Sequence, residues 1–314
     1  KSADLTNPAD TVLVMNGTYT KTLEDKQSEN NSVLRITRSG SAFRYITYKA
    51  MEGHTPKIFV DFNYAGIRIN ASYIVIDGFT VEGNLPNLSF EEANAVARGT
   101  DEAAALQNYK FNSNGIGSFP DAENPATIHH LIIRNNTVFN HPAGGIFSNG
   151  SDYVRIEGNT VYNNAYYSAY ANSGISFYKS TAIDNRTDFK MFIRNNKIFK
   201  NENKVPFWFS NASNPSQRVI TDGNGIIIDD SRNTQGTGNV VYTGKFLINN
   251  NVVFDNGGRG INIYSSNGVL AYKNTTFQNG RTPGFTELAV GDSDDVKFTE
   301  NIFVSMPDRG PLPK

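Results

Sequence analysis

The chain repeats one pattern of hydrophobic and polar positions: a short apolar strand, two or three Asn or Gly residues, and a second short apolar strand. Aligned on one residue of the polar turn, successive copies lie 58, 23, 37, 55, 23 and 27 residues apart. The shortest step is the length of one solenoid coil, and we interpret the longer steps as a coil that carries an inserted loop. The aligned turn residues are Gly78, Asn136, Asn159, Asn196, Asn251, Asn274 and Asn301.

Between copies lies a further strand that begins on Gly, as in GGIFS, SGISFY, NGIIIDD and RGINIYSS. One coil cannot bury its apolar side alone, but coils stacked about 4.8 Å apart pair their backbones and form a continuous core. Asn tolerates the left-handed conformation at the turn and can stack its side-chain amides. The pattern predicts an all-β, right-handed parallel β-helix. A β-sandwich, the alternative, would not repeat the Asn-rich turn in seven consecutive units.

We expect a single domain over residues 1–314, with an N-terminal cap and first coils in 1–50, readable coils in 67–305 and a C-terminal tail in 306–314. One segment departs from the repeat: residues 89–108 are rich in Ala and Glu, and Ser89 with Glu92 matches a helix capping box. The sequence therefore predicts a short helical insertion there.

Composition restricts the possible functions of the chain more than it restricts the possible folds. The 314 residues carry a net charge of −1, which gives no support for a nucleic-acid or membrane-surface partner. The absence of Cys excludes disulfides, a thiol nucleophile and a thiolate metal site. No apolar run approaches the roughly 20 residues that span a bilayer. The chain begins at Lys1 without Met, as a mature or trimmed form would.

Register indicates where the chemistry lies, because residues at equal offsets from the turn Asn stack above one another. Tyr167, Lys204 and Arg259 each lie eight residues beyond a turn Asn, and His141 lies five beyond. The longest inserted loops begin at this edge, and long loops on a rigid scaffold commonly carry function. These loops are also rich in aromatic residues. Cations and exposed rings in one groove suit an acidic polysaccharide.

Each candidate also has an ordinary structural interpretation. A single His or a loop Tyr often only packs or hydrogen-bonds, and a Lys is usually a solvated charge. Arg259 follows two glycines at a corner, where a hydrogen bond to a carbonyl is as plausible as substrate binding. The agreement of register, loop length and chemistry favours Tyr167 and Lys204 as a functional pair.

Asp229 and Asp230 form a competing constellation. A carboxyl pair on a β-helix is compatible with glycoside hydrolysis, but neighbouring residues of a strand point to opposite faces. Either residue could instead bind calcium, although an acidic pair alone is a weak metal signal. Capping of a turn is the interpretation we favour for this pair. The four His residues show no metal-ligand spacing.

The segments NNAYYSAYANSGISFY, NENKVPFWFS, GNGIIIDDS and NNVVFDNGGRGINIYSS resemble the β-helix alginate lyases of polysaccharide lyase family 31. The resemblance spans about residues 73–305, and the Tyr loop followed one coil later by N-E-N-K-V-P is its specific part. It implies β-elimination at the 4-O-glycosidic bond of alginate, with a preference for poly-mannuronate. It also implies Tyr167 and Lys204 as the catalytic residues, for which we expect Lys204 as base and Tyr167 as acid, with the reverse open.

The same resemblance implies a secreted bacterial enzyme without a cofactor, and we expect a monomer that binds no nucleic acid or membrane. Calcium is possible but unsupported. The open alternatives are a glycoside hydrolase, an epimerase, a pectate lyase and a non-catalytic polysaccharide-binding β-helix. The expected substrate-binding residues are His141, Tyr166, Tyr170, Asn172, Trp208, Asp230 and Arg259.

Overall fold

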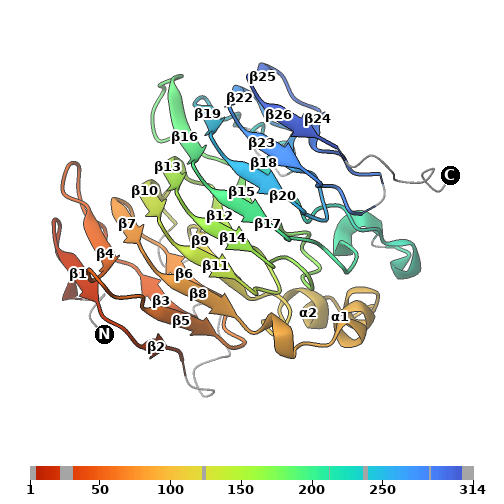
Figure 1. Ribbon diagram of the computed structural model, residues 1–314, viewed down its shortest axis with the longest axis horizontal. Coiled ribbons are helices and arrows are strands. Elements are labelled where there is room, and N and C mark those ends of the chain that lie inside the picture. The colour runs from red at the N-terminus through yellow and green to blue at the C-terminus, as the bar shows by residue number, and fades with distance from the viewer. Residues whose placement is uncertain are drawn as a thin grey trace.

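The computed structural model describes residues 5–21, 31–121, 125–211, 213–235, 240–282 and 284–305. Their strands stack into a parallel β-helix in which each strand pairs in parallel with its equivalent in the next coil (Figure 1). The predicted all-β stack is therefore confirmed. The expected C-terminal tail, 306–314, lies outside the described residues.

Three sheets run the length of the stack, and each complete coil gives one strand to each of them. The first sheet contains β1 (Thr11–Val14), β4 (Ile46–Ala50), β7 (Ile74–Asp77), β10 (His129–Arg134), β13 (Asp152–Glu157), β16 (Phe189–Arg194), β19 (Lys245–Asn249), β22 (Val269–Tyr272) and β25 (Val296–Thr299). The second sheet contains β2 (Thr18–Tyr19), β5 (Lys57–Val60), β8 (Thr80–Gly83), β11 (Thr137–Phe139), β14 (Thr160–Tyr162), β17 (Lys197–Phe199), β20 (Val252–Phe254), β23 (Thr275–Phe277) and β26 (Ile302–Val304). The third sheet contains β3 (Ser32–Ile36), β6 (Ala65–Ile69), β9 (Asn114–Ser118), β12 (Ile146–Asn149), β15 (Ile175–Tyr178), β18 (Ile226–Asp229), β21 (Ile261–Tyr264) and β24 (Leu288–Gly291).

The core is a column of β-branched residues enclosed by the three sheets. Alternate residues of each strand point inward, so Ile133 of β10 pairs with Ile156 of β13, and both are fully buried. The same alternation places Val138 and Ile175 inside from the other two sheets. Burial of an aliphatic side chain of this size contributes about 1.5–3 kcal/mol. Repetition of the coil, rather than any one contact, therefore builds the stability.

An asparagine ladder fills the turn between the first and second sheets. The side-chain oxygen of Asn159 accepts the backbone and side-chain amides of Asn136, at 2.9 and 3.0 Å. The left-handed conformation belongs to the residue before each ladder position, such as Asn135 with φ 58°, rather than to the ladder Asn as predicted. The ladder runs through Asn136, Asn159, Asn196, Asn251, Asn274 and Asn301.

The sequence alignment is wrong by one residue at its first copy. Thr80 pairs with Thr137, so Phe79 and not Gly78 is equivalent to the ladder residue Asn136. The Phe79 amide accordingly donates to the Asn136 side-chain oxygen at 2.9 Å. The alignment failed there because the ladder position of that coil is not an asparagine.

A second ladder fills the corner after the second sheet, five residues further along each coil. The backbone amide of Asn164 donates to the side-chain oxygen of Asn201 at 3.2 Å, and the pattern continues to Asn256 and Asn279. The carboxylate of Glu287 ends the ladder by accepting both amides of Asn279, at 2.9 and 2.6 Å. These bonds satisfy buried polar groups at every turn of the corner.

The helical insertion is confirmed, and it lies between β8 and β9. It comprises η3 (Leu85–Asn87), α1 (Phe90–Ala97) and α2 (Glu102–Leu106). Ser89 caps α1 by accepting the Glu92 amide at 3.2 Å, but the second half of the predicted capping box is wrong. The Ser89 hydroxyl bonds Glu91 instead, and Glu92 pairs with Lys110. No helix in the described part of the chain is long and apolar enough to cross a membrane.

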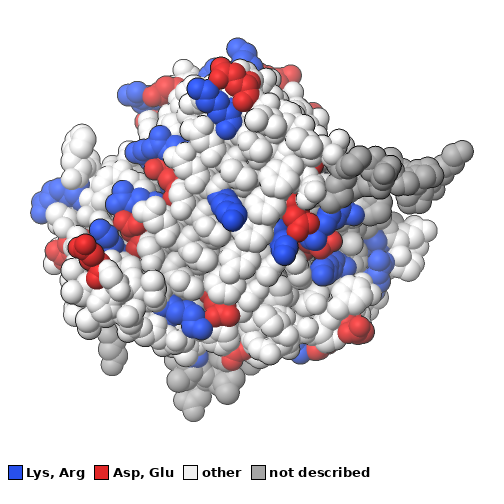
Figure 2. Space-filling view, viewed as in Figure 1, with Lys and Arg blue, Asp and Glu red and all other residues white. Residues whose placement is uncertain are grey.

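The outer face of the second sheet carries a stack of aromatic rings. Neighbouring centroids are 4.9 Å apart with nearly parallel planes, so each ring covers the face of the next. The rings therefore offer their edges, not their faces, to a sugar, and the stack is structural. Figure 2 shows that this face carries few charges and that charged residues of both signs gather at the corner where β17 and β20 end. The stacked rings are Phe139, Tyr162, Phe199, Phe254 and Phe277.

Candidate active site

The two longest insertions in the described part of the chain leave the stack at the corner between the second and third sheets, which we call the loop corner. The helical insertion and the 200–225 loop, which contains η4 (Trp208–Asn211) and η5 (Pro215–Gln217), lie side by side there (Figure 1). A small apolar core joins them, and the Arg218 guanidinium donates to the Ala97 carbonyl at 2.7 Å. The two insertions thus form one wall beside the ends of the coils.

Tyr167 and Lys204 occupy equivalent positions on adjacent coils, as their offsets predict. In the parallel ladders here, an amide donates to the carbonyl one residue before its register partner. The Lys204 amide donates to the Tyr166 carbonyl at 2.9 Å, which places Lys204 opposite Tyr167. Tyr167 is half-buried and Lys204 is exposed. The register prediction is confirmed, while their catalytic roles stay a prediction.

The ammonium group of Lys204 lies over a different ring from the one expected. Its Nζ is 4.3 Å from the centroid of the Tyr166 ring. The Tyr166 and Tyr167 rings meet edge to face, with centroids 6.2 Å apart. The two tyrosines therefore have separate surroundings, one against the lysine and the other against the helical insertion.

Tyr167 is kept in its protonated form. Partial burial, and then the negative charge of Glu91 on α1, raise the pKa of the Tyr167 phenol. The Phe90 ring lies 6.5 Å from that of Tyr167 and is itself partly exposed. A phenol with a raised pKa can donate a proton at neutral pH but is a poor base. Sequence reasoning missed Phe90 and Glu91 because they belong to an insertion with no counterpart in the repeat.

The return of the 200–225 loop brings Asp222 to this corner, near Arg259 of the next coil. A Cβ on Gly223 would lie 2.3 Å from the Asn203 backbone, and one on Gly258 would lie 2.7 Å from the Asp222 carbonyl. Only glycine lets these backbone segments pass so closely. Asp222 and Arg259 are consequently placed beside the coil that carries Lys204.

Asp222 and Arg259 interact through charge and through the loop backbone. The Asp222 carboxylate accepts hydrogen bonds from Asn224 at 2.7 Å and Thr221 at 2.8 Å, yet burial raises the pKa of Asp222. The Arg259 guanidinium lies 4.4 Å from the Phe285 ring centroid. Burial lowers the pKa of Arg259, and the charge of Asp222 opposes that effect. Arg259 thus offers a positive group beside an acid that resists ionisation.

Asp229 and Asp230 are separated as strand geometry predicts. Asp229 points outward from β18, between Tyr178 and Tyr264 of the neighbouring strands. Burial, then the charges of Asp222 and Asp230, raise the pKa of Asp229 to about 7. The ionisation of Asp229 is therefore opposed by the charge of Asp222 as well as by that of its sequence neighbour Asp230.

Three of the expected substrate contacts are buried in the structure. Asp230 is fully buried and caps the loop by accepting the Thr234 amide at 2.6 Å, the role the sequence favoured. His141 is fully buried at the start of the second ladder, with its amide on Asn164 at 3.0 Å. Trp208 is 5% exposed, and the Arg218 guanidinium covers its ring at 3.6 Å.

The remaining expected contacts stay accessible. Tyr170 is 46% exposed, and Asn172 is partly buried with its amide donating to Ser168 at 2.7 Å. Tyr166 and Arg259 are also partly exposed. Sequence reasoning also missed Arg281, although register could have revealed it. Arg281 lies seven residues beyond Asn274, as Tyr166 lies seven residues beyond Asn159.

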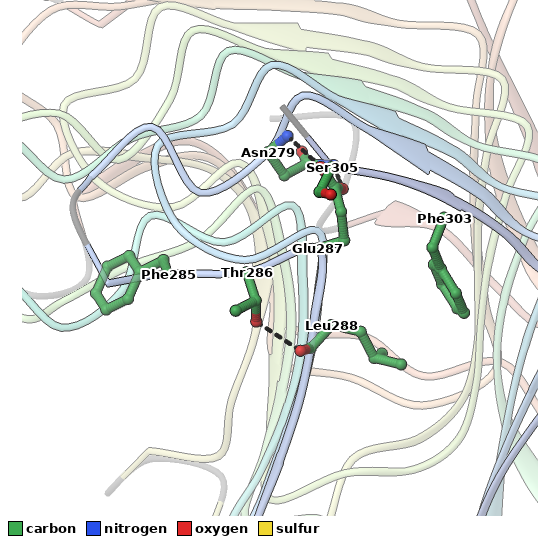
Figure 3. A pocket seen from close by; sticks show the side chains of 7 residues that line it. All are labelled: Asn279, Phe285, Thr286, Glu287, Leu288, Phe303 and Ser305. Carbon is green, nitrogen blue, oxygen red and sulfur yellow. Dashed lines mark hydrogen bonds between the residues drawn. The ribbon is translucent and has the colours of Figure 1, made fainter. Parts of the chain in front are cut away.

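A pocket of about 330 Å³ lies at the C-terminal end of the stack (Figure 3). Glu287, which ends the second ladder, and Phe285, which supports Arg259, belong to its lining. Neither Tyr167 nor Lys204 lines it. Among the described residues there is no group of three or more His, Asp or Glu side chains that could hold a metal ion.

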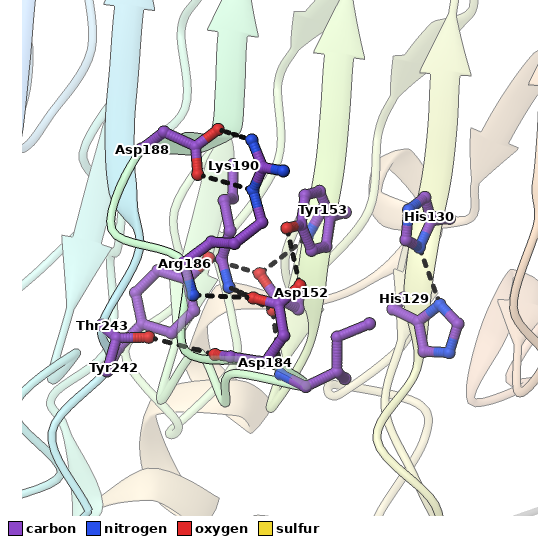
Figure 4. A network of polar contacts seen from close by, with 11 residues as sticks. His129, His130, Asp152, Tyr153, Asp184, Arg186, Asp188, Lys190, Tyr242 and Thr243 are labelled. Carbon is purple, nitrogen blue, oxygen red and sulfur yellow. Dashed lines mark hydrogen bonds and ion pairs between the residues drawn. The ribbon is translucent and has the colours of Figure 1, made fainter.

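A second polar cluster lies at the opposite corner, between the third and first sheets (Figure 4). Lys190 is fully buried there between Asp152 at 2.7 Å and Asp184 at 3.0 Å. Tyr242 donates to Asp152 at 2.5 Å, and Tyr153 donates to Asp184 at 2.8 Å. The charge of Lys190 is thus paired inside the cluster, which indicates a structural role.

Comparison with known proteins agrees with this architecture. A family model described as a right-handed β-helix region matches residues 65–310. The chain belongs to this right-handed β-helix family. Among solved structures, this β-helix protein is similar to a pectate lyase at 17% identity and a TM-score of 0.52, over 100% of this chain and 75% of the lyase.

Two further solved structures are similar to this β-helix protein. The A-module of a mannuronan C-5 epimerase from Azotobacter vinelandii shares 11% identity at a TM-score of 0.41, over 95% of this chain and 87% of the module. An alginate lyase from Paenibacillus sp. str. FPU-7 shares 12% identity at a TM-score of 0.39, over 95% of this chain and 93% of that enzyme. At such identities the likeness concerns the fold alone. No curated protein matches the sequence.

Proposed function

We propose that this β-helix protein is a polysaccharide lyase that cleaves alginate by β-elimination, with a preference for poly-mannuronate. The observation that carries the proposal is the placement of Tyr167 and Lys204 at equivalent positions of adjacent coils, beside the wall of inserted loops. A phenol and an amine one coil apart supply an acid and a base on the same side of a bound chain.

In the proposed reaction, the neutral amine of Lys204 removes the C5 proton of the uronate. The electron pair forms a double bond between C4 and C5, and the bond between C4 and the glycosidic oxygen breaks. Tyr167 donates its phenolic proton to the leaving oxygen. The raised pKa of Tyr167 supports this division of roles, because a protonated phenol is the form that an acid needs.

Removal of the C5 proton also needs a group that neutralises the adjacent carboxylate. Arg259 and Asn172 are the remaining candidates, since His141 is buried. Arg259 suits the role because a guanidinium can bind a carboxylate through two hydrogen bonds. Tyr170 and Phe90, both partly exposed, would offer apolar surface to the sugar rings. We include secretion and independence of metal and cofactor in the proposal.

The test is to incubate the protein with poly-mannuronate and follow the ultraviolet absorbance of the unsaturated product, with and without a chelator. We expect the absorbance to rise at the same rate with and without the chelator. The rate should be about 10²–10⁴-fold lower in Tyr167→Phe and in Lys204→Ala. Near wild-type elimination in both variants would reject the site. A ratio change among uronates without cleavage would identify an epimerase instead.

One observation favours a second candidate, a glycoside hydrolase. Asp222 and Asp229 both have raised pKa values, and the charge of Asp222 contributes to the rise at Asp229, as one carboxyl group of a hydrolase does to the other. A hydrolase would release reducing ends without ultraviolet absorbance, and Asp229→Asn would abolish that release. The same variant of a lyase would keep most of its elimination rate.

A further inference from the structure

Lys204 is held against Tyr166 at two points. Its backbone amide donates to the Tyr166 carbonyl at 2.9 Å, and its ammonium nitrogen lies 4.3 Å from the centroid of the Tyr166 ring. A lysine side chain is flexible and can adopt many rotamers, so a fixed ring beneath its end limits where the amine points. The ring therefore determines which part of the loop corner the amine faces.

Tyr166 itself lies among charged residues from later coils. The charges of Glu202, Arg281 and Asp255 all act on the Tyr166 phenol. The two terminal nitrogens of Arg281 lie 2.9 Å from Glu202 and 3.2 Å from Asp255. The Glu202 side chain lies across the backbone of the next coil, where a Cβ on Gly257 would be 2.2 Å from its Cγ. Tyr166, Glu202, Asp255 and Arg281 come from four successive coils.

We propose that Tyr166 is a positioning residue, whose ring lies beneath the end of the Lys204 side chain and holds its amine toward the substrate. The effect that we expect on catalysis rests on the proposed function, whereas the placement of the Lys204 amine by the Tyr166 ring does not. Tyr166 was expected to contact the substrate. The structure places the Lys204 ammonium group over one face of its ring.

The face of an aromatic ring attracts an ammonium ion. Removal of the Tyr166 ring should therefore let the Lys204 side chain adopt other rotamers and misplace its amine.

The kinetic test compares Tyr166→Leu, which removes the ring, with Tyr166→Phe, which keeps it. For Tyr166→Leu we expect kcat to fall about 10–100-fold with KM within about twofold, because misplaced groups lose rate rather than affinity. Tyr166→Phe should keep kcat within about threefold, because it keeps the ring.

The matched control is Tyr162→Leu. Tyr162 lies on the same coil, partly exposed, between the stacked rings of Phe139 and Phe199 at 4.9 Å. Its loss disturbs packing to a similar degree without touching Lys204. We expect Tyr162→Leu to keep kcat close to the wild-type value. An equal fall in kcat in this control would overturn the proposal.

A second readout needs no substrate. Lysine amines are methylated with a ¹³C reagent, which keeps their charge, and the Lys204 signal is identified by its loss in Lys204→Arg. The ring current of Tyr166 should displace this signal in the wild-type protein and in Tyr166→Phe, but not in Tyr166→Leu. An undisplaced wild-type signal overturns the proposal, even if Tyr166→Leu fails to fold. A displaced signal without elimination activity would instead refute the proposed function alone.

Discussion

Two lysines at opposite corners of the third sheet show how one kind of side chain serves two purposes. Lys190 is fully buried, pairs with Asp152 and Asp184, and lies 4.8 and 5.4 Å from the rings of Tyr153 and Tyr242. Lys204 also lies on a tyrosine ring, but it is exposed, and among the described residues no carboxylate forms an ion pair with it. A neutralised lysine stabilises the corner, whereas an exposed one is available to a ligand.

The largest effect expected from this comparison is catalytic. Lys204→Met should lower the elimination rate by about 10²–10⁴-fold, because it removes the proposed base, and should leave the unfolding temperature unchanged. The ultraviolet assay and a thermal melt measure both quantities. Lys197→Met is the control, since Lys197 is also exposed and lies 5.3 Å from the Phe199 ring. Equal rate losses in both variants would show that Lys204 has no special role.

The next effect concerns stability, to which the buried Lys190 should contribute more than an exposed lysine does. Lys190→Met leaves Asp152 buried without its cation, so the free energy of unfolding should fall by about 3–5 kcal/mol. Urea denaturation at neutral pH measures the loss. Lys245→Met removes the exposed pair of Lys245 with Asp295, 3.0 Å apart, and should cost less than about 1 kcal/mol. Similar losses in the two variants would contradict a structural role that is particular to Lys190.

His141 extends the comparison to a buried base without a charged partner. Burial lowers the pKa of His141 to about 3, so the folded protein binds a proton there less readily than the unfolded chain. Its contribution to stability is present above about pH 6.5 and is lost as the pH falls toward 3, by up to about 1.4 kcal/mol per pH unit. His141→Asn should therefore lose less stability between pH 6 and 4 than the wild type does. Parallel pH curves in urea denaturation would contradict this.

The smallest effect is expected at Asp229, on the outer face near the site. Its folded-state pKa of about 7 exceeds the ordinary value of an aspartate, so its ionisation costs stability as the pH rises from about 4 to 7. Asp229→Asn removes this cost. We expect the variant to gain roughly 1–2 kcal/mol over the wild type at pH 8 and almost nothing at pH 4. A gain that does not change with pH would show that Asp229 ionises normally.

The repeat was enough to predict the coil, because alternation and the Asn-rich turn are local properties that recur at a fixed period. It also predicted that Tyr167 and Lys204 lie opposite each other, since register in a stack follows from counting. Counting failed in the first copy, where Phe79 and not an asparagine occupies the ladder position. It also failed for His141, because an offset of five residues was taken to reach the same edge as an offset of eight. Ser89 was correctly placed at a helix start, but which Glu it bonds depends on Lys110.

The sequence by itself thus determined the stack, its corners and the residues that share each corner, because these depend on separations along the chain. Only the tertiary structure decided which of those side chains are available. Trp208 and Asp230 look as suitable as Tyr170 in the sequence, but Arg218 covers the first and the 230–235 loop closes over the second. Likewise, Phe90, Glu91, Asp222 and Arg281 reach the loop corner from distant segments. Burial and contact between inserted loops have no period, so no repeat can encode them.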